Sequence, residues 1–135
     1  MTSVRTPREI VEQLFSTLSS RDADTFVASL AADAVFEIPF PIPGMPQRIV
    51  GRDAIREHLA QRWSGLSGIE IHGIYPTICE SIDPGVLFVE NDVDMTVSGV
   101  RERVHTSVNR VHVRDGEVTL FRDYMNTARV AGLRD

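Results

Sequence analysis

Residues 109–126, NRVHVRDGEVTLFRDYMN, contain two segments of alternating apolar and polar residues on either side of Asp115-Gly116. Alternation with a period of two is typical of a strand with one buried face, and Asp-Gly between two such segments indicates a hairpin turn. The pattern extends back to about Ile69, with further turns at Asp83-Pro84-Gly85 and Ser98-Gly99. The sequence therefore predicts four consecutive antiparallel strands, over residues 69–80, 86–97, 101–113 and 117–126.

The first half of the chain has helical periodicity instead. Thr6-Pro7-Arg8-Glu9 has the form of a capping box and opens a helix whose apolar residues are Ile10, Val11, Leu14, Phe15 and Leu18. Asp22 is expected to cap a second helix with Phe26, Val27 and Leu30 on one side, and a third is expected over Gly51 to Trp63. The second and third helices are separated by two segments. These are a short strand over 34–40 and a stiff loop with prolines at 39, 41, 43 and 46.

These elements predict one α+β domain over residues 1–135. The apolar helix faces need a partner, and a sheet that wraps around them would bury them. We therefore expect a cone-shaped domain in which three N-terminal helices pack in a curved antiparallel sheet that encloses a pocket. Such a pocket is a usual place for a small, largely apolar ligand.

Composition excludes several classes of function. Asp and Glu total 19 against 14 basic residues, so the net charge of −5 argues against nucleic acid or an anionic membrane as partner. All the basic residues are arginine, which excludes Schiff-base chemistry and a P-loop. Cys79 is the one cysteine, and no paired histidines occur, so we expect no metal and no cofactor. We expect a cytoplasmic protein, because the sequence contains no apolar run long enough to span a membrane and its N-terminus lacks the apolar region of a signal peptide.

Four segments carry a resemblance to a known superfamily: Asp33–Glu37, Gly51–Ile55, Val113–Val118 and Phe121–Asn126. Together they resemble the nuclear-transport-factor-2-like superfamily in its SnoaL-like and ketosteroid-isomerase-like branch. The resemblance covers nearly the whole chain and implies the cone-shaped fold. It leaves the reaction open, because the superfamily includes isomerases, polyketide cyclases, dehydratases, epoxide hydrolases and proteins without catalysis.

Comparison with individual branches singles out Asp123. The tyrosine and aspartate positions of ketosteroid isomerases hold Leu14 and Ile38 here, so that machinery is absent. The two aspartates of limonene-epoxide-hydrolase-like enzymes are matched by Asp94 and Asp123, but the arginine between them is replaced by an acid. The run from Arg122 to Asn126 is similar to the last strand of the A/B proteins of phenazine biosynthesis, which implies that Asp123 lies in the pocket.

Strand parity independently places Asp123 on one face with Phe121 and Met125. A carboxylate between apolar neighbours on a cavity wall would be desolvated, which raises its pKa and suits it to proton transfer near neutral pH. The alternative is that this face is solvated and that Asp123 pairs with an arginine.

Other candidates come from the neighbouring strands. Glu90, Asp92 and Asp94 alternate on one strand face; they either form a solvated row or enter the pocket of Asp123 as further catalytic acids. We expect further pocket residues to bind the substrate, namely Glu37, His105, Asn109, Phe121, Met125 and Trp63. His105 is alternatively structural, and His58, His72 and His112 are interpreted as structural.

The sequence thus favours a cofactor-independent acid/base enzyme acting on a small apolar metabolite, led by Asp123. Proton transfer next to a carbonyl, ring closure, dehydration and epoxide opening are the candidate reactions. The alternative is a protein of the same fold that binds a small ligand without catalysis. Because both faces of the last strand carry apolar side chains, we also expect a homodimer that covers the outer face of the sheet.

Overall fold

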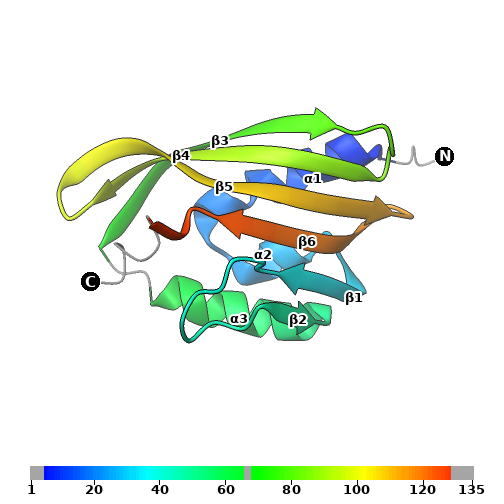
Figure 1. The fold of residues 1–135 in the computed structure, drawn as a ribbon, viewed down its shortest axis with the longest axis horizontal. Coiled ribbons are helices and arrows are strands. Elements are labelled where there is room, and N and C mark those ends of the chain that lie inside the picture. Colours follow the sequence, from blue (N-terminus) through cyan, green and yellow to red (C-terminus); the bar gives the residue numbers. More distant parts are fainter. Residues whose placement is uncertain (1–4, 66–67, 129–135) are drawn as a thin grey trace.

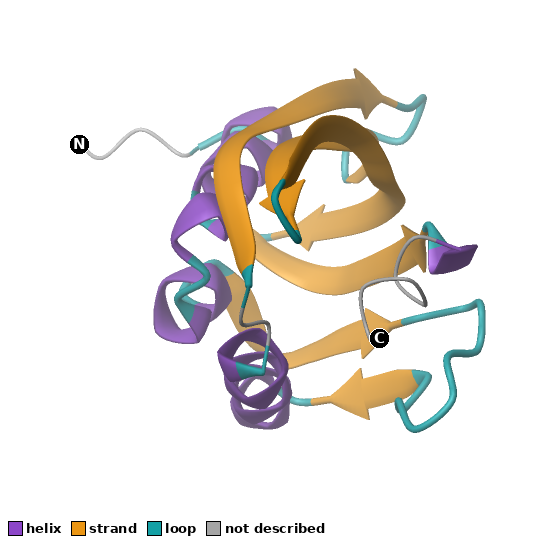
Figure 2. Cartoon of the chain, turned by 90° about the vertical axis from the view of Figure 1, so that its left-hand side faces the viewer, coloured by secondary structure: helices purple, strands orange, loops and turns teal. Residues whose placement is uncertain are grey.

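The computed structural model describes residues 5–65 and 68–128 and contains a single curved sheet of six strands. In chain order the elements are α1 (Pro7–Ser16), the 3₁₀ turn η1 (Leu18–Ser20), α2 (Ala23–Val27), β1 (Leu30–Glu37), β2 (Arg48–Val50), α3 (Arg52–Ser64), β3 (Ile69–Glu80), β4 (Val86–Val97), β5 (Val100–Arg114) and β6 (Glu117–Met125). The strand order across the sheet is β2-β1-β6-β5-β4-β3, and Figures 1 and 2 show the helices gathered on its concave side. An α+β fold is confirmed.

Helix α1 forms as its sequence indicates. The Thr6 side chain accepts a hydrogen bond from the Glu9 backbone N–H, and the Glu9 side chain accepts one from the Thr6 N–H. This reciprocal cap satisfies two donors that the helix itself leaves unpaired. The buried residues of α1 are the apolar ones that the helical spacing selects: Ile10, Val11, Leu14 and Phe15.

The expectation of three N-terminal helices needs correction. Helix α2 has only five residues, and Leu30, expected on it, is the first residue of β1. Helix α3 follows two strands rather than preceding the sheet. The first strand also begins and ends earlier than expected, because it must pair with β6 from Leu30 onward and because Pro39 and Pro41 beyond it lack a backbone donor.

The sheet is not antiparallel throughout. Strand β1 runs parallel to β6, with Phe36 opposite Phe121 and Glu37 opposite Arg122, while the other pairs of neighbouring strands are antiparallel. Strand β2 was not expected; it follows the prolines and pairs with β1 at the sheet edge. The four predicted C-terminal strands are present, with ends within one residue of the predicted ones.

Register shifts bend the long strands around the helices. One extra residue is inserted at His72 in β3, at Thr106 in β5 and at Thr119 in β6. Such bulges increase local twist and let a sheet curl. Figure 2 shows β3, β4 and β5 curling over at one end, and a small cluster of Val93, Met95 and Val104 lies apart from the main core there.

Within the described residues, no helix is both long enough and apolar enough to span a bilayer.

The turn between β3 and β4 offers a test of how closely Gly85 approaches the backbone of β5. A Cβ on Gly85 would lie 2.8 Å from the Val113 carbonyl oxygen, and the Gly85 carbonyl accepts the Val113 N–H at 2.8 Å. We expect Gly85→Ala to lower the free energy of unfolding by about 1–3 kcal/mol, because the backbone of β5 has to shift. Ile82→Ala, in the same turn but fully exposed, is the control and is expected within about 0.5 kcal/mol of wild type in urea unfolding. Equal stabilities for both variants would contradict the close approach.

Candidate active site

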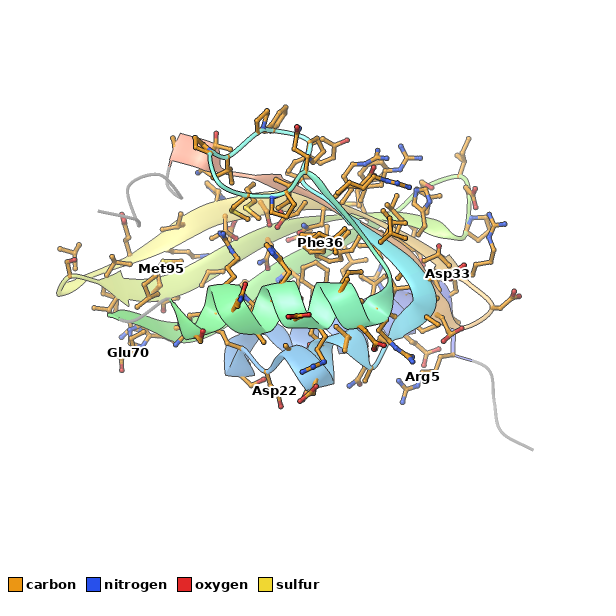
Figure 3. All side chains as sticks on the ribbon, turned by 90° about the horizontal axis from the view of Figure 1, so that it is seen from below. Arg5, Asp22, Asp33, Phe36, Glu70 and Met95 are labelled. Atoms are coloured by element: carbon orange, nitrogen blue, oxygen red, sulfur yellow. The ribbon has the colours of Figure 1, made fainter. Side chains whose placement is uncertain are left out.

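A cavity of about 220 Å³ lies between the helices and the concave face of the sheet. It occupies the space between the main core and the small cluster at the curled end, so apolar side chains of both line it. Figure 3 labels two lining residues: Phe36 lies over α3, between this helix and the sheet, and Met95 lies on the strands beyond the end of α3. Because a cavity of roughly 150 Å³ holds benzene, this one suits a ligand of one or two rings.

Phe121 is the centre of the aromatic wall. Its ring stacks on Phe36 at 5.5 Å between centroids and meets Phe26 edge-on at 5.5 Å, and Phe15 lies at 6.0 Å. The Trp63 ring extends this wall through an edge contact with Phe26 at 5.9 Å. The expectation that Phe121 and Trp63 border the pocket agrees with these positions, and Met125 lines it as well.

Asp123 projects into this cavity from β6, on the same face as Phe121 and Met125. Asn109, directly opposite on β5, donates a hydrogen bond from Nδ2 to Asp123 Oδ1 at 3.0 Å. The Ser107 hydroxyl in turn donates to Asn109 Oδ1 at 3.1 Å. Asn109 is only 2% exposed, so a short chain of polar groups fixes the orientation of one carboxyl group in a largely apolar wall.

Burial raises the pKa of Asp123 from 3.8 to about 7. The hydrogen bond from Asn109 and the positive charge of Arg62 act in the opposite direction, and burial outweighs both because the charged carboxylate loses its water. A group with a pKa near 7 exists in comparable amounts as acid and as base at neutral pH. Asp123 is thus suited to accept a proton from a ligand or to donate one.

Helix α3 adds two polar side chains that sequence reasoning missed, His58 and Arg62. The Arg62 guanidinium contacts the sulfur atoms of Met45 and Met125, at 2.8 and 3.9 Å. Burial, followed by the charge of Arg62, lowers the pKa of His58, so its ring is neutral at pH 7. Its Nε2 is buried without a hydrogen-bond partner among the described residues.

A signal for these two residues existed in the spacing. Ile55, Leu59 and Trp63 define the inward stripe of α3, and positions 58 and 62 fall within that stripe at helical spacing. Polar residues inside an apolar stripe indicate a buried polar site. The sequence-based prediction instead interpreted His58 as structural.

The three acids of β4 are not in the cavity. Val89, Asn91 and Val93 face inward, so the alternating partners Glu90, Asp92 and Asp94 face outward. Arg101 donates two hydrogen bonds to the Asp94 carboxylate, at 3.1 and 2.9 Å, and they lower the pKa of that carboxyl group. Of the two alternatives for this strand, the solvated row is the correct one, and the shared pocket with Asp123 is wrong. The aspartate pair of the epoxide-hydrolase pattern is therefore split between two faces of the sheet.

His105 also faces outward, contrary to expectation, because the bulge at Thr106 reverses the parity of β5. Residues after the bulge, Ser107 and Asn109, keep the inward face, whereas His105 is 91% exposed in its side chain and hydrogen-bonds Asp92 through Nδ1. Glu90, Asp92 and His105 do come together, in a depression on the outer face of the sheet.

Glu37 is likewise absent from the cavity wall. Its carboxylate accepts a hydrogen bond from Arg122 Nε at 3.0 Å and lies 3.8 Å from Arg48 Nε, because the last residue of β1 is directly opposite Arg122 on the outward face of β6. The cavity thus brings together five of the ten predicted site residues: Asp123, Asn109, Phe121, Met125 and Trp63. The five predicted residues outside it are Glu37, Glu90, Asp92, Asp94 and His105.

In the described part of the chain, no group of three or more His, Cys, Asp or Glu side chains is arranged to hold a metal ion.

Residues 11–121 match the family model of the SnoaL-like domain. The chain is 27% identical over 131 residues to the uncharacterized PhzA/B-like protein PA3332 of Pseudomonas aeruginosa, covering 90% of this chain and 85% of that protein. The crystal structure of TerC with polyporic acid superposes with a TM-score of 0.75 at 20% identity and 94% and 96% coverage. An LEH-like epoxide hydrolase of M. tuberculosis gives a TM-score of 0.64 at 22% identity, covering 98% and 88% of the two chains. Because the matched residues span most of its length, the chain belongs to the SnoaL-like domain family and has the nuclear-transport-factor-2-like fold.

Proposed function

We propose that this protein is a cofactor-independent acid/base enzyme that acts on a small, ring-containing, largely apolar metabolite, with Asp123 as the group that gives and takes the proton. The observation that carries the proposal is a single carboxyl group, held by Asn109 inside an apolar cavity, whose pKa burial raises to about 7. The structural neighbours of this chain include an LEH-like epoxide hydrolase, which supports a pocket enzyme in general terms.

The geometry supports separate roles for the aromatic wall and for Asp123. Ring contacts with the wall around Phe121 would position the ligand, and the Asn109 amide keeps one oxygen of Asp123 engaged, leaving the second oxygen for the reacting proton. Proton removal next to a carbonyl, ring closure and dehydration all need one such group. Epoxide opening remains among the candidate reactions, with Asp123 as the one acid of the epoxide-hydrolase pattern that lines the cavity.

A specific observation supports a second candidate function, a small-molecule binding protein without catalysis. Glu90, Asp92 and Asp94 face outward, so Asp123 is the one carboxyl group among the described residues of the cavity wall. Binding needs only shape and one or two polar anchors, whereas catalysis needs proton exchange with the ligand. The two candidates therefore differ in the result expected when residue 123 can no longer exchange a proton: an enzyme loses turnover, whereas a binding protein has no turnover to lose.

A catalysis test follows that does not require the natural substrate. 5-Nitrobenzisoxazole opens when a base removes a carbon-bound proton, and its size suits the cavity. We expect the wild type to accelerate this reaction, with a rate that rises as pH increases through about 7 because Asp123 ionises. Asp123→Asn is expected to lower the rate about 100-fold or more. Glu90→Gln, on the outer face, is the control and should keep the wild-type rate. A wild-type rate no higher than that of Asp123→Asn would contradict the enzyme proposal.

The titration of Asp123 also predicts a pH dependence of stability. Because its pKa is raised on folding, the folded state binds more protons than the unfolded state between about pH 4 and 7, and stability falls as pH rises through this window. Asp123→Asn lacks this effect. Relative to that variant, we expect the wild type to lose up to about 4 kcal/mol of unfolding free energy between pH 4 and 7, from a three-unit shift. Parallel stability curves in urea unfolding would contradict the buried titration.

The outer face of the sheet supports the proposed homodimer. Tyr75, Phe88 and Val108 are 45%, 38% and 41% exposed there, from three neighbouring strands. We expect sedimentation to give a dimer at micromolar concentration and Val108→Arg to give a monomer, because the arginine would have to be buried against the second copy. A monomeric wild type would contradict the proposed homodimer.

We also propose that the protein is cytoplasmic.

A further inference from the structure

Two buried side-chain nitrogen or oxygen atoms of the described residues have no hydrogen-bond partner: Nε2 of His58 and Oδ1 of Asn91. Both residues line the cavity, His58 from helix α3 and Asn91 from strand β4 of the sheet. Native proteins pair nearly all of their buried polar groups, because an unpaired one costs stability. The position of both atoms in residues of the cavity wall indicates that a ligand supplies their partners.

Asn91 is the more informative of the two residues. It is 6% exposed and lies on the inward face of β4, between Val89 and Val93. The imidazole Nε2 of His58 donates or accepts a hydrogen bond according to the tautomer of the ring, whereas an amide oxygen only accepts. A ligand that satisfies Asn91 must therefore carry a hydrogen-bond donor.

Thr106 fixes the orientation of the Asn91 amide. The Thr106 hydroxyl donates its one hydrogen to the backbone carbonyl oxygen of Asn91 at 2.9 Å. The hydroxyl oxygen is then an acceptor for Asn91 Nδ2, at 3.4 Å. Turning the amide over would bring two oxygen atoms together with no hydrogen between them. The inserted residue of β5 thus holds the nitrogen of the amide, and Oδ1 remains for a ligand.

Asn91 and Asp123 lie at different places on the sheet wall. Asn91 is opposite Ser107 on β5. Asp123 on β6 is opposite Asn109, two residues further along β5. Two strand spacings and two residues put the backbones of Asn91 and Asp123 about 12 Å apart. Because both side chains point into the concave face of the sheet, a ligand of one or two rings can reach both.

We propose that Asn91 accepts a hydrogen bond from the ligand, so that the cavity selects ring compounds with a hydroxyl or N–H group over rings of the same shape without a donor. A ligand that lacks the donor leaves the buried oxygen unpaired, which is the basis of strong discrimination in such sites. Thr106 is a positioning residue that acts through the Asn91 amide. The inference rests on the proposed function, because it names the class of ligand that reaches Asp123.

The probes are indole and benzofuran, two fused-ring compounds of nearly the same shape that differ in one N–H group. Calorimetric titration gives the affinity of each, and the ratio of the two affinities measures the preference for a donor. We expect this ratio to be about fivefold or more higher in the wild type than in Asn91→Leu, which keeps the branched shape and removes the acceptor. Glu90→Gln, on the outward face of the same strand, is the control and should keep the wild-type ratio.

A second variant and a change of pH assign the preference to the amide. Thr106→Val should give an intermediate ratio, because it leaves the Asn91 amide unheld. The wild-type ratio should be the same at pH 6 and pH 8, since an amide does not titrate. A ratio that rises with pH would assign the N–H group to the carboxylate of Asp123 and overturn the role of Asn91.

Stability separates a ligand-binding role of Asn91 from a structural one. In urea unfolding we expect Asn91→Leu to keep or raise the midpoint, because it removes a buried oxygen that has no partner among the described residues. Asn109→Leu should lower the midpoint, since both ends of that amide are paired, with Ser107 and Asp123. A lower midpoint in Asn91→Leu together with an unchanged affinity ratio would identify a structural residue and overturn the proposal.

The outcomes also separate this inference from the proposed function. 5-Nitrobenzisoxazole carries no O–H or N–H group, so its opening tests Asp123 without a hydrogen bond to Asn91. Equal ratios in the wild type and Asn91→Leu, or no binding of indole at millimolar concentration, would overturn the role of Asn91. The acid/base proposal would still stand if the opening depended on Asp123. A higher ratio in a wild type that does not open 5-nitrobenzisoxazole would support Asn91 in a protein that binds without catalysis.

Discussion

The cavity depends on one constraint, the extra residue at Thr106 in β5. Before this residue, the even-numbered positions of β5 face inward; after it, the odd-numbered positions do. Thr106 and Ser107 therefore both border the cavity, while His105 points to solvent. The shift brings Asn109 inward and directly opposite Asp123. Without this register, the polar end of the cavity would not meet the carboxyl group of β6.

Electrostatics gives the cavity its chemical character. One carboxyl group, two arginines and a neutral histidine share a wall that is otherwise mostly apolar or aromatic. Loss of hydration dominates the behaviour of Asp123, because one amide hydrogen bond and the nearby charge of Arg62 do not offset it. Asp94 on the outer face differs from Asp123, because its hydrogen bonds with Arg101 lower the pKa of its carboxyl group.

Local patterns in the sequence predicted much of the fold. The capping box defined α1, and turn residues defined the four long strands within one residue at each end. Parity placed Asp123 correctly because β6 has its bulge at Thr119, before the site. It failed for His105, since a single inserted residue leaves no clear mark in the alternation. The parallel pairing of β1 with β6 joins distant segments, and no local pattern encodes it.

That parallel pairing has a consequence for how the chain acquires its structure. Strand β1 has only the short edge strand β2 beside it until β6 emerges from the ribosome about eighty residues later, so one edge of β1 stays unpaired for most of synthesis. The last strand supplies both the missing neighbour of β1 and the carboxyl group of the cavity. Completion of the sheet and assembly of the site are therefore the same late event, and a nascent chain that stalls before Glu117 exposes a sheet edge prone to aggregation.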